Sequence, residues 1–264
     1  MPVIVMGWVS VVLCLDAGGS LGTQRLLGLL TWLLLAAVLC RETVLVRAQT
    51  AVVVLFATAV EFTFSPLLEV YVYRFDNVPA YVPPGHGLVY LAAMAIGRSS
   101  WVRAHVRGCT WAVVAVGGAW ALWGLVGSDR VDALGAFWFG CLVAFLLWGP
   151  SRPLYVGAFV VVSYLEILGT SVGTWQWQGH DPTGLVAIGN PPSGAAGGYG
   201  WFDLAALLLA PRLLAWLRPV TAAGRAPAGT AVAAREAAGT AAGSSRDRTE
   251  EEPGGRPRTS RSSA

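Results

Sequence analysis

The sequence predicts an all-α fold: a polytopic transmembrane helix bundle of about eight spans in residues 1–217, followed by a disordered tail in residues 218–264. The first observation is composition, because 55% of the 264 residues are hydrophobic and only 12% are charged. That charged fraction is roughly half the value for soluble domains. The second observation is the spacing of the charged residues along the chain. Uncharged runs such as residues 108–128 have roughly the length that crosses a bilayer, and they are apolar on every side.

Eight predicted spans follow from these runs and from the polar clusters between them. They are residues 2–19, 25–41, 50–73, 84–99, 108–127, 132–150, 153–174 and 198–217. The first range lacks the basic start and the small-residue cleavage site of a signal peptide, so we expect a retained helix. The fourth range begins after Pro83 and Pro84, and proline is tolerated in the first turn of a helix.

The arginines predict the orientation. With both termini in the cytoplasm, the inner loops hold Arg41, Arg47, Arg98, Arg103, Arg107 and Arg152, and the outer loops hold Arg25, Arg74 and Arg130. An excess of basic residues on the cytoplasmic side is typical of multi-pass proteins. We therefore expect a multi-pass protein of the cell membrane whose main partner is the lipid bilayer.

The tail, residues 218–264, consists mainly of small and polar residues and has no aromatic residue after Trp216. Such a segment buries too little apolar surface to fold, which predicts disorder. Its arginines are interleaved with Asp247 and followed by Glu250, so the sequence does not favour a nucleic-acid partner.

Two stretches of the chain resemble each other. In each, a glutamate in a span is followed by an aromatic-rich exit, a double proline and a re-entering helix. Glu69 leads to Pro83-Pro84, and Glu166 leads to Pro191-Pro192. The offset of four spans predicts two parallel four-helix halves, related by an axis along the membrane normal. Chance similarity is the alternative for a match this short.

Ionisable residues within spans mark candidate sites, because a charge in the bilayer is costly. Glu61, Glu69 and Glu166 lie within predicted spans, and Asp203 lies near the start of the last one. Glu61, Ser65 and Glu69 are spaced to form one polar stripe on a helix. Gly169 and Gly173 are spaced to admit a neighbouring helix beside Glu166. We expect the third and seventh spans to meet around their carboxylates, although each glutamate could instead only hydrogen-bond between helices.

The predicted outer loops supply the other candidates. Their catalytic candidates are His86, His180 and Asp181, and Trp175, Trp177 and Asn190 are candidates for substrate binding with Glu61. The alternatives are a helix start at His86, an ordinary turn at His180-Asp181, and an interfacial aromatic belt for the tryptophans. The long loop that begins at Trp175 is expected to fold back as a cover. Because no pair of these residues has a metal-binding helical spacing, we expect no metal and no cofactor.

Three functions fit this pattern. A carboxyl group in an apolar site can act as a general acid on a lipid-soluble substrate, such as an isoprenoid or an acyl lipid, with aromatic faces stabilising a developing cation. Glu166 or Glu69 would be the acid, and the other glutamate or His180 the base. Paired membrane carboxylates also fit a proton-coupled carrier. A non-catalytic scaffold is the third alternative.

One motif resembles a known family. Residues Glu166-Ile167-Leu168-Gly169-Thr170, followed by Gly173-Thr174-Trp175-Gln176-Trp177, are similar to a membrane glutamate, glycine-rich turn and aromatic pair of membrane carotenoid-biosynthesis proteins. The likeness covers about a tenth of the chain, while the chain as a whole resembles a bacterial multi-pass membrane protein. The resemblance implies an enzyme acting on an isoprenoid.

Overall fold

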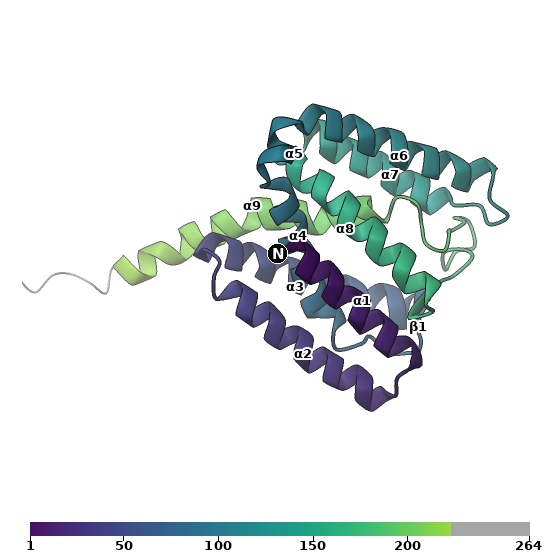
Figure 1. The fold of residues 1–264 in the computed structure, drawn as a ribbon, viewed down its shortest axis with the longest axis horizontal. Helices are drawn as coiled ribbons and strands as arrows, with labels where there is room; N and C mark the ends of the chain where they lie inside the picture. The colour runs from purple at the N-terminus through teal and green to yellow at the C-terminus, as the bar shows by residue number, and fades with distance from the viewer. Residues whose placement is uncertain (223–264) are drawn as a thin grey trace, which may run out of the picture. The chain divides into compact units, whose positions relative to one another are not determined.

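The computed structural model describes residues 1–222, and most of the predicted tail lies outside them. Helices dominate the described part (Figure 1). In chain order the elements are α1 (Pro2–Gly18), α2 (Leu21–Leu39), α3 (Val44–Phe62), the π-helical turn η1 (Thr63–Leu67), β1 (Tyr71–Tyr73), α4 (Val82–Gly97), α5 (Ser100–Ala104), α6 (Val106–Val126), α7 (Ala133–Trp148), α8 (Arg152–Ser171), β2 (Trp175–Trp177) and α9 (Ala195–Ala222).

Each of the eight predicted ranges overlaps one of these helices. Five helical segments are long and apolar enough to cross a membrane: Leu21–Leu39, Val44–Leu67, Val106–Val126, Arg152–Ser171 and Ala195–Leu217. Helices α1 and α7 are apolar but shorter. The helical fold class is therefore confirmed, and the helices fit a membrane protein. The count of eight spans stays a prediction.

Short polar side chains set where several helices begin. Ser20, Thr43 and Asp132 each accept a hydrogen bond from a backbone N–H in the first turn of α2, α3 and α7. These groups pair N–H donors that a helix leaves free at its start. In α1–α2 and α6–α7, short connections end at these capping residues, and the two helices of each pair pack together.

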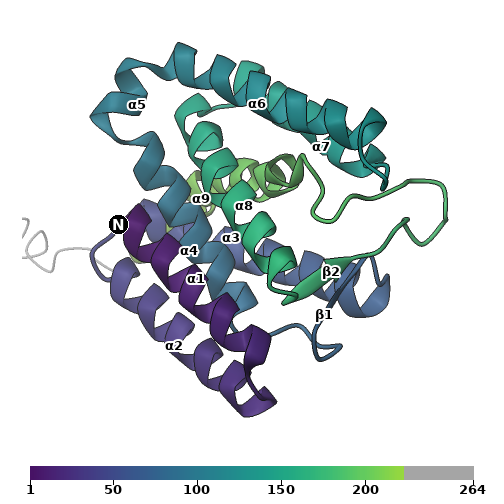
Figure 2. The same cartoon turned by 45° about the vertical axis from the view of Figure 1, so that its right-hand side comes forward.

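Helix α4 forms the centre of the fold. Leu88, Leu91 and Ala92 on this helix are completely buried, and α1, α2, α3 and α8 all pack against it (Figure 2). Its contact with α8 is the most extensive, because glycines allow the two backbones to meet. A side chain at Gly157 would stand 2.1 Å from the carbonyl oxygen of Ala93. Small residues permit such close helix crossings in membrane proteins.

The predicted third span is wrong at its outer end. The α-helix stops at Phe62, and η1 carries Pro66. Proline lacks an N–H and disrupts the regular ladder, so the chain widens into a π turn in which the N–H of Leu68 bonds the carbonyl of Thr63. Glu69 then adopts a φ of 51° and is exposed. It therefore does not continue a polar stripe with Glu61.

The two short strands join distant parts of the chain. Strands β1 and β2 pair antiparallel, with Tyr71 opposite Trp177 and Tyr73 opposite Trp175. Since side chains alternate along a strand, these four aromatic residues share one face, and all four are buried. The loop after α8 thus folds back over the bundle, as expected of a cover, and its tryptophans do not lie in an exposed belt.

The predicted helix contact at Gly169 is also wrong. A side chain at Gly169 would stand 1.8 Å from the indole of Trp175. Gly173 lies beyond α8 with a φ of 75°. These glycines let the chain reverse and seat Trp175 against its own helix, rather than admitting a second helix.

We expect Gly157→Ala to destabilise the α4–α8 crossing, because its methyl group would overlap the backbone of Ala93. Overpacking of this kind costs about 1–3 kcal/mol, so the thermal unfolding midpoint in detergent should fall by several degrees. Gly140→Ala is the matched control, since nothing lies within 4 Å of a side chain there. Equal midpoints for the two variants would contradict the proposed packing.

Candidate functional site

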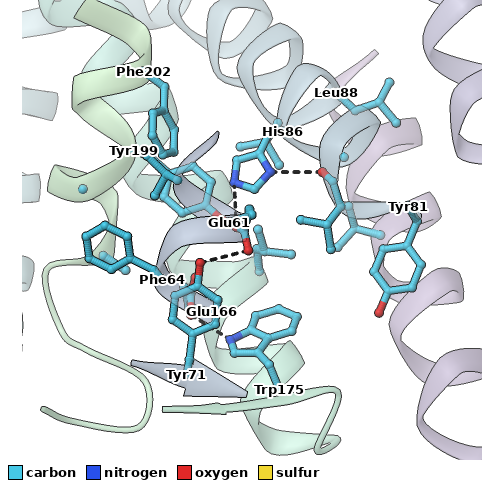
Figure 3. A pocket seen from close by; sticks show the side chains of 18 of the residues that line it. Glu61, Phe64, Tyr71, Tyr81, His86, Leu88, Glu166, Trp175, Tyr199 and Phe202 are labelled. Atoms are coloured by element: carbon cyan, nitrogen blue, oxygen red, sulfur yellow. Dashed lines mark hydrogen bonds and ion pairs between the residues drawn. The ribbon is translucent and has the colours of Figure 1, made fainter. Parts of the chain in front are cut away.

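An apolar cavity of about 280 Å³ lies between the helices and the two-stranded sheet (Figure 3). Helices α1, α3, α4, α8 and α9 and both strands contribute to its walls. The aromatic members of the lining are Trp8, Phe56, Phe64, Tyr71, Tyr73, Tyr81, Trp138, Trp175, Trp177, Tyr199, Trp201 and Phe202. Glu61, His86 and Glu166 bring ionisable groups into this apolar surface.

Glu61 is held by three side chains. The hydroxyl groups of Tyr71 and Tyr73 donate hydrogen bonds to its Oε2, at 2.9 and 2.8 Å. Its Oε1 lies 3.4 Å from Nε2 of His86. Helix α3 supplies the carboxylate, β1 the phenols and α4 the imidazole, so three elements converge on one group. Glu61 is only 7% exposed.

The surroundings of His86 determine where its protons lie. Its Nδ1 is 3.0 Å from the carbonyl oxygen of Val82. A carbonyl can only accept, so Nδ1 carries a hydrogen. Nε2 faces Oε1 of Glu61 at 3.4 Å, so this side of the ring can accept a proton as neutral imidazole or donate one as imidazolium. Tyr199 stacks on the imidazole, with ring centroids 5.0 Å apart, and restricts its rotation. The pair can therefore both give and take a proton.

Glu166 has a different environment. The indole N–H groups of Trp175 and Trp177 both donate to its Oε2, at 3.2 and 3.1 Å. In the described part of the chain, no hydrogen bond from a protein donor reaches its Oε1. The carboxyl group is 4% exposed and belongs to the cavity wall. One oxygen is thus fixed by the sheet, and the other is available to whatever occupies the cavity.

The cavity reaches the side of the bundle. Phe56 on α3 and Trp201 on α9 line it, yet they are 40% and 49% exposed. The ring of Phe202 meets that of Phe56 edge-on, with centroids 5.2 Å apart. Phe56 and Trp201 therefore belong both to the cavity wall and to the apolar outer surface of α3 and α9.

Asp203 lies behind His86 rather than in the main cavity. It borders a small space of about 10 Å³ together with His86, Tyr90 and Tyr199. The hydroxyl groups of Tyr90 and Tyr155 are buried without a hydrogen-bond partner in the described chain. Most of the other residues that line this space are apolar. Asp203 thus lies apart from the main cavity, with His86 and Tyr199 bordering both spaces.

Besides Asp203, four predicted site residues do not reach the cavity. Glu69 and His180 are exposed, and Asn190 accepts a hydrogen bond from the backbone N–H of Trp177. Asp181 caps its own turn. The Thr183 hydroxyl and neighbouring backbone N–H groups hold the pKa of Asp181 below its usual value, which keeps it ionised and favours a turn over a general acid.

The loop between β2 and α9 is anchored by two residues that were not among the sequence candidates. Asp132 accepts hydrogen bonds from the backbone N–H groups of Gly135, Gly189 and Ser193. Arg130 donates to the carbonyl oxygens of Trp177 and Ile188, both at 2.6 Å. These contacts hold the loop that carries Trp175 and Trp177, so they position the donors to Glu166.

The tyrosines that bind Glu61 were also missed. The signal was present, because Tyr71-Val72-Tyr73 follows Glu61 at nearly the distance at which Trp175-Gln176-Trp177 follows Glu166. Both segments are aromatic–x–aromatic, and both donate to the preceding glutamate. These hydrogen bonds pair Glu61 with Glu166, whereas the similarity predicted from the sequence paired Glu69 with Glu166.

Within residues 1–222, no group of three or more histidine, cysteine, aspartate or glutamate residues is placed to hold a metal ion. The comparisons with known proteins give no further guide: no family model, no curated protein and no solved structure matches the chain. The likeness to carotenoid-biosynthesis proteins stays a prediction. What the site can do must be argued from its own geometry.

We expect Asp132→Ala to loosen the loop over the cavity, because three backbone N–H groups would lose a buried acceptor. Hydrogen bonds to charged groups contribute about 1.5–3 kcal/mol each. The measurement is limited proteolysis within residues 178–190, with Asp129→Ala as the exposed neighbouring control. Unchanged cleavage of the Asp132 variant would contradict the anchoring role.

Proposed function

We propose that this protein is a membrane-embedded enzyme that uses carboxylate–histidine acid/base chemistry on a lipophilic substrate, an isoprenoid or an acyl lipid. One observation carries the proposal: Oε1 of Glu61 and Nε2 of His86 lie 3.4 Å apart at the wall of an apolar, aromatic cavity. General acids and bases are effective when the proton is held where an apolar substrate can reach it. Phe56 and Trp201 line the cavity and are partly exposed on the outside of the bundle, which supports entry from the bilayer.

The proposed setting is the cell membrane, with eight spans and both termini in the cytoplasm. The helices that correspond to the predicted spans are α1, α2, α3, α4, α6, α7, α8 and α9. The arginine distribution supports this orientation. It puts the β1–β2 sheet and the cavity beneath it in the outer half of the bilayer.

The proposed reaction is proton transfer at carbon. The Glu61–His86 pair donates a proton to one carbon of a double bond, and the π electrons form the new C–H bond. The adjacent carbon is left electron-deficient. The deprotonated pair then removes a proton from a neighbouring carbon, whose C–H electrons form the new double bond. The net result is an isomerised substrate and an unchanged enzyme, with atoms and charge balanced.

An isoprenoid is the substrate class we favour, because its branched double bonds are readily protonated and its chain fits an aromatic, apolar cavity. The resemblance at Glu166 to membrane carotenoid-biosynthesis proteins supports the same choice. Glu166 and Asp203 then have secondary roles, since neither touches the Glu61–His86 pair by a hydrogen bond.

A proton-coupled carrier is the second candidate. The observation that favours it is the repeated unit of a helix glutamate bonded by an aromatic–x–aromatic strand. Two similar halves suit alternating access, in which one half rocks against the other. A carrier would bind and release its substrate unchanged, which separates it experimentally from an enzyme.

The test uses deuterium, because the reaction exchanges substrate hydrogen with solvent. Purified protein in nanodiscs is incubated in D₂O with bacterial membrane lipids and mixed isoprenoids, and mass spectrometry records deuterium at carbon. We expect incorporation with the unmodified protein. Glu61→Gln should lower the rate of incorporation about 100-fold or more, because a general acid or base typically contributes at least that factor to a rate.

Glu69→Gln is the matched control, since Glu69 is exposed and outside the cavity. It should keep full incorporation. If the unmodified protein incorporates no deuterium into any lipid, the enzyme proposal fails and the carrier becomes the better account. Equal loss in both variants would also contradict the assigned role of Glu61.

A further inference from the structure

The two glutamates of the cavity are not equivalent, and the difference concerns the charge of the ligand. Glu61 faces a histidine that can balance its charge. Glu166 faces two indole N–H groups, which donate hydrogen bonds but carry no net charge. No lysine or arginine is among the described residues that line the cavity. An ionised Glu166 therefore leaves the cavity with one uncompensated negative charge.

Burial and hydrogen bonding act on Glu166 in opposite directions. Burial favours the neutral acid, whereas two N–H donors on one oxygen stabilise the carboxylate. The second oxygen, Oε1, has no protein donor in the described chain, and the residue is only 4% exposed. A buried carboxylate is stable only when it is paired. A ligand that binds at Oε1 can supply the partner, either as a positive charge or as a hydrogen-bond donor.

The surrounding aromatic rings favour a positive charge over a neutral hydrogen-bond donor as the partner of Glu166. Aromatic faces attract cations through their quadrupoles, whereas a neutral hydroxyl group gains little from them. Trp175, Trp177 and Tyr71 stand next to one another, with Tyr71 and Trp177 centroids 4.5 Å apart. The ring centroids of Trp138 and Trp177 lie 5.6 Å apart. An anion beside a wall of rings is the arrangement that binds an alkylated cation with apolar arms.

We infer that the cavity selects lipophilic monocations, with Glu166 as the fixed counter-ion, Trp175 and Trp177 as its supports, and the aromatic wall as the contact surface. This inference deepens the proposed function, on which it rests: the electron-deficient carbon left by proton donation from Glu61–His86 is the cation that the site stabilises. A stable ammonium ion of the same shape should then bind to the unoccupied site in preference to its neutral counterpart.

The experiment compares two probes in nanodiscs. One is decyltrimethylammonium, and the other is its neutral tert-butyl isostere, in which carbon replaces the charged nitrogen. Binding is followed by intrinsic tryptophan fluorescence against the mole fraction of probe in the bilayer. We expect the ammonium probe to bind about tenfold more tightly or better, the range of a desolvated cation–aromatic contact.

Three variants separate charge from shape. Glu166→Gln keeps a carbonyl oxygen that can accept both indole N–H groups, so the fold should survive; we expect the preference for the ammonium probe to disappear while binding of the neutral probe is unchanged. Glu166→Asp keeps the charge and should keep most of the preference. Glu69→Gln, outside the cavity, should behave like the unmodified protein.

Equal binding of the two probes to the unmodified protein, or an unaltered preference in Glu166→Gln, would overturn the inference. The outcome is independent of the deuterium assay. Deuterium incorporation without ammonium preference would leave the proposed enzyme standing and remove the cation site. Ammonium preference without incorporation would support the cation site and remove the enzyme.

Discussion

The structure depends on how two buried carboxylates obtain hydrogen-bond donors. An unpaired acidic group inside an apolar bundle is unfavourable, and this chain supplies the donors from two aromatic strands. Tyr71 and Tyr73 bind Glu61, and Trp175 and Trp177 bind Glu166. Because the strands pair with each other, satisfying one carboxylate also places the other. The antiparallel sheet thus joins the α3–α4 part of the chain to the α8–α9 part and closes the end of one cavity.

The helices could be predicted well because their signal is local. Apolar runs and polar breaks locate eight helices, and the largest error is in the third, which was predicted over residues 50–73 and is observed over Val44–Phe62. The third and seventh spans were expected to meet around their carboxylates, and Glu61 and Glu166 line one cavity together with His86. The failure at Glu69 is also local in origin: Pro66 lies in a π turn that ends the α-helix, and the spacing of Glu61, Ser65 and Glu69 gives no sign of that ending.

The rest could not be predicted because it depends on contacts between distant segments. The pairing of residues 71–73 with residues 175–177 could not be predicted, because three residues are too few to show the alternating pattern of a strand. Asp132 anchors the loop through Gly189 and Ser193, which lie 57 and 61 positions further along the chain. Gly169 was assigned to helix packing, whereas its space is filled by Trp175. In each case the residue can be seen in the sequence, but its partner is determined by the tertiary fold.

The most direct test of this account asks whether the two aromatic strands really pair. Val72 and Gln176 are direct partners at the centre of the sheet, so cysteines at these positions should be bridged by a short bifunctional thiol reagent. The four native cysteines are first replaced by serine, and Val72→Cys with Thr183→Cys serves as the control. Rapid cross-linking of the 72–176 pair and none of the control is the predicted result. Equal cross-linking, or none at 72–176, would contradict the sheet and with it the shared cavity of Glu61 and Glu166.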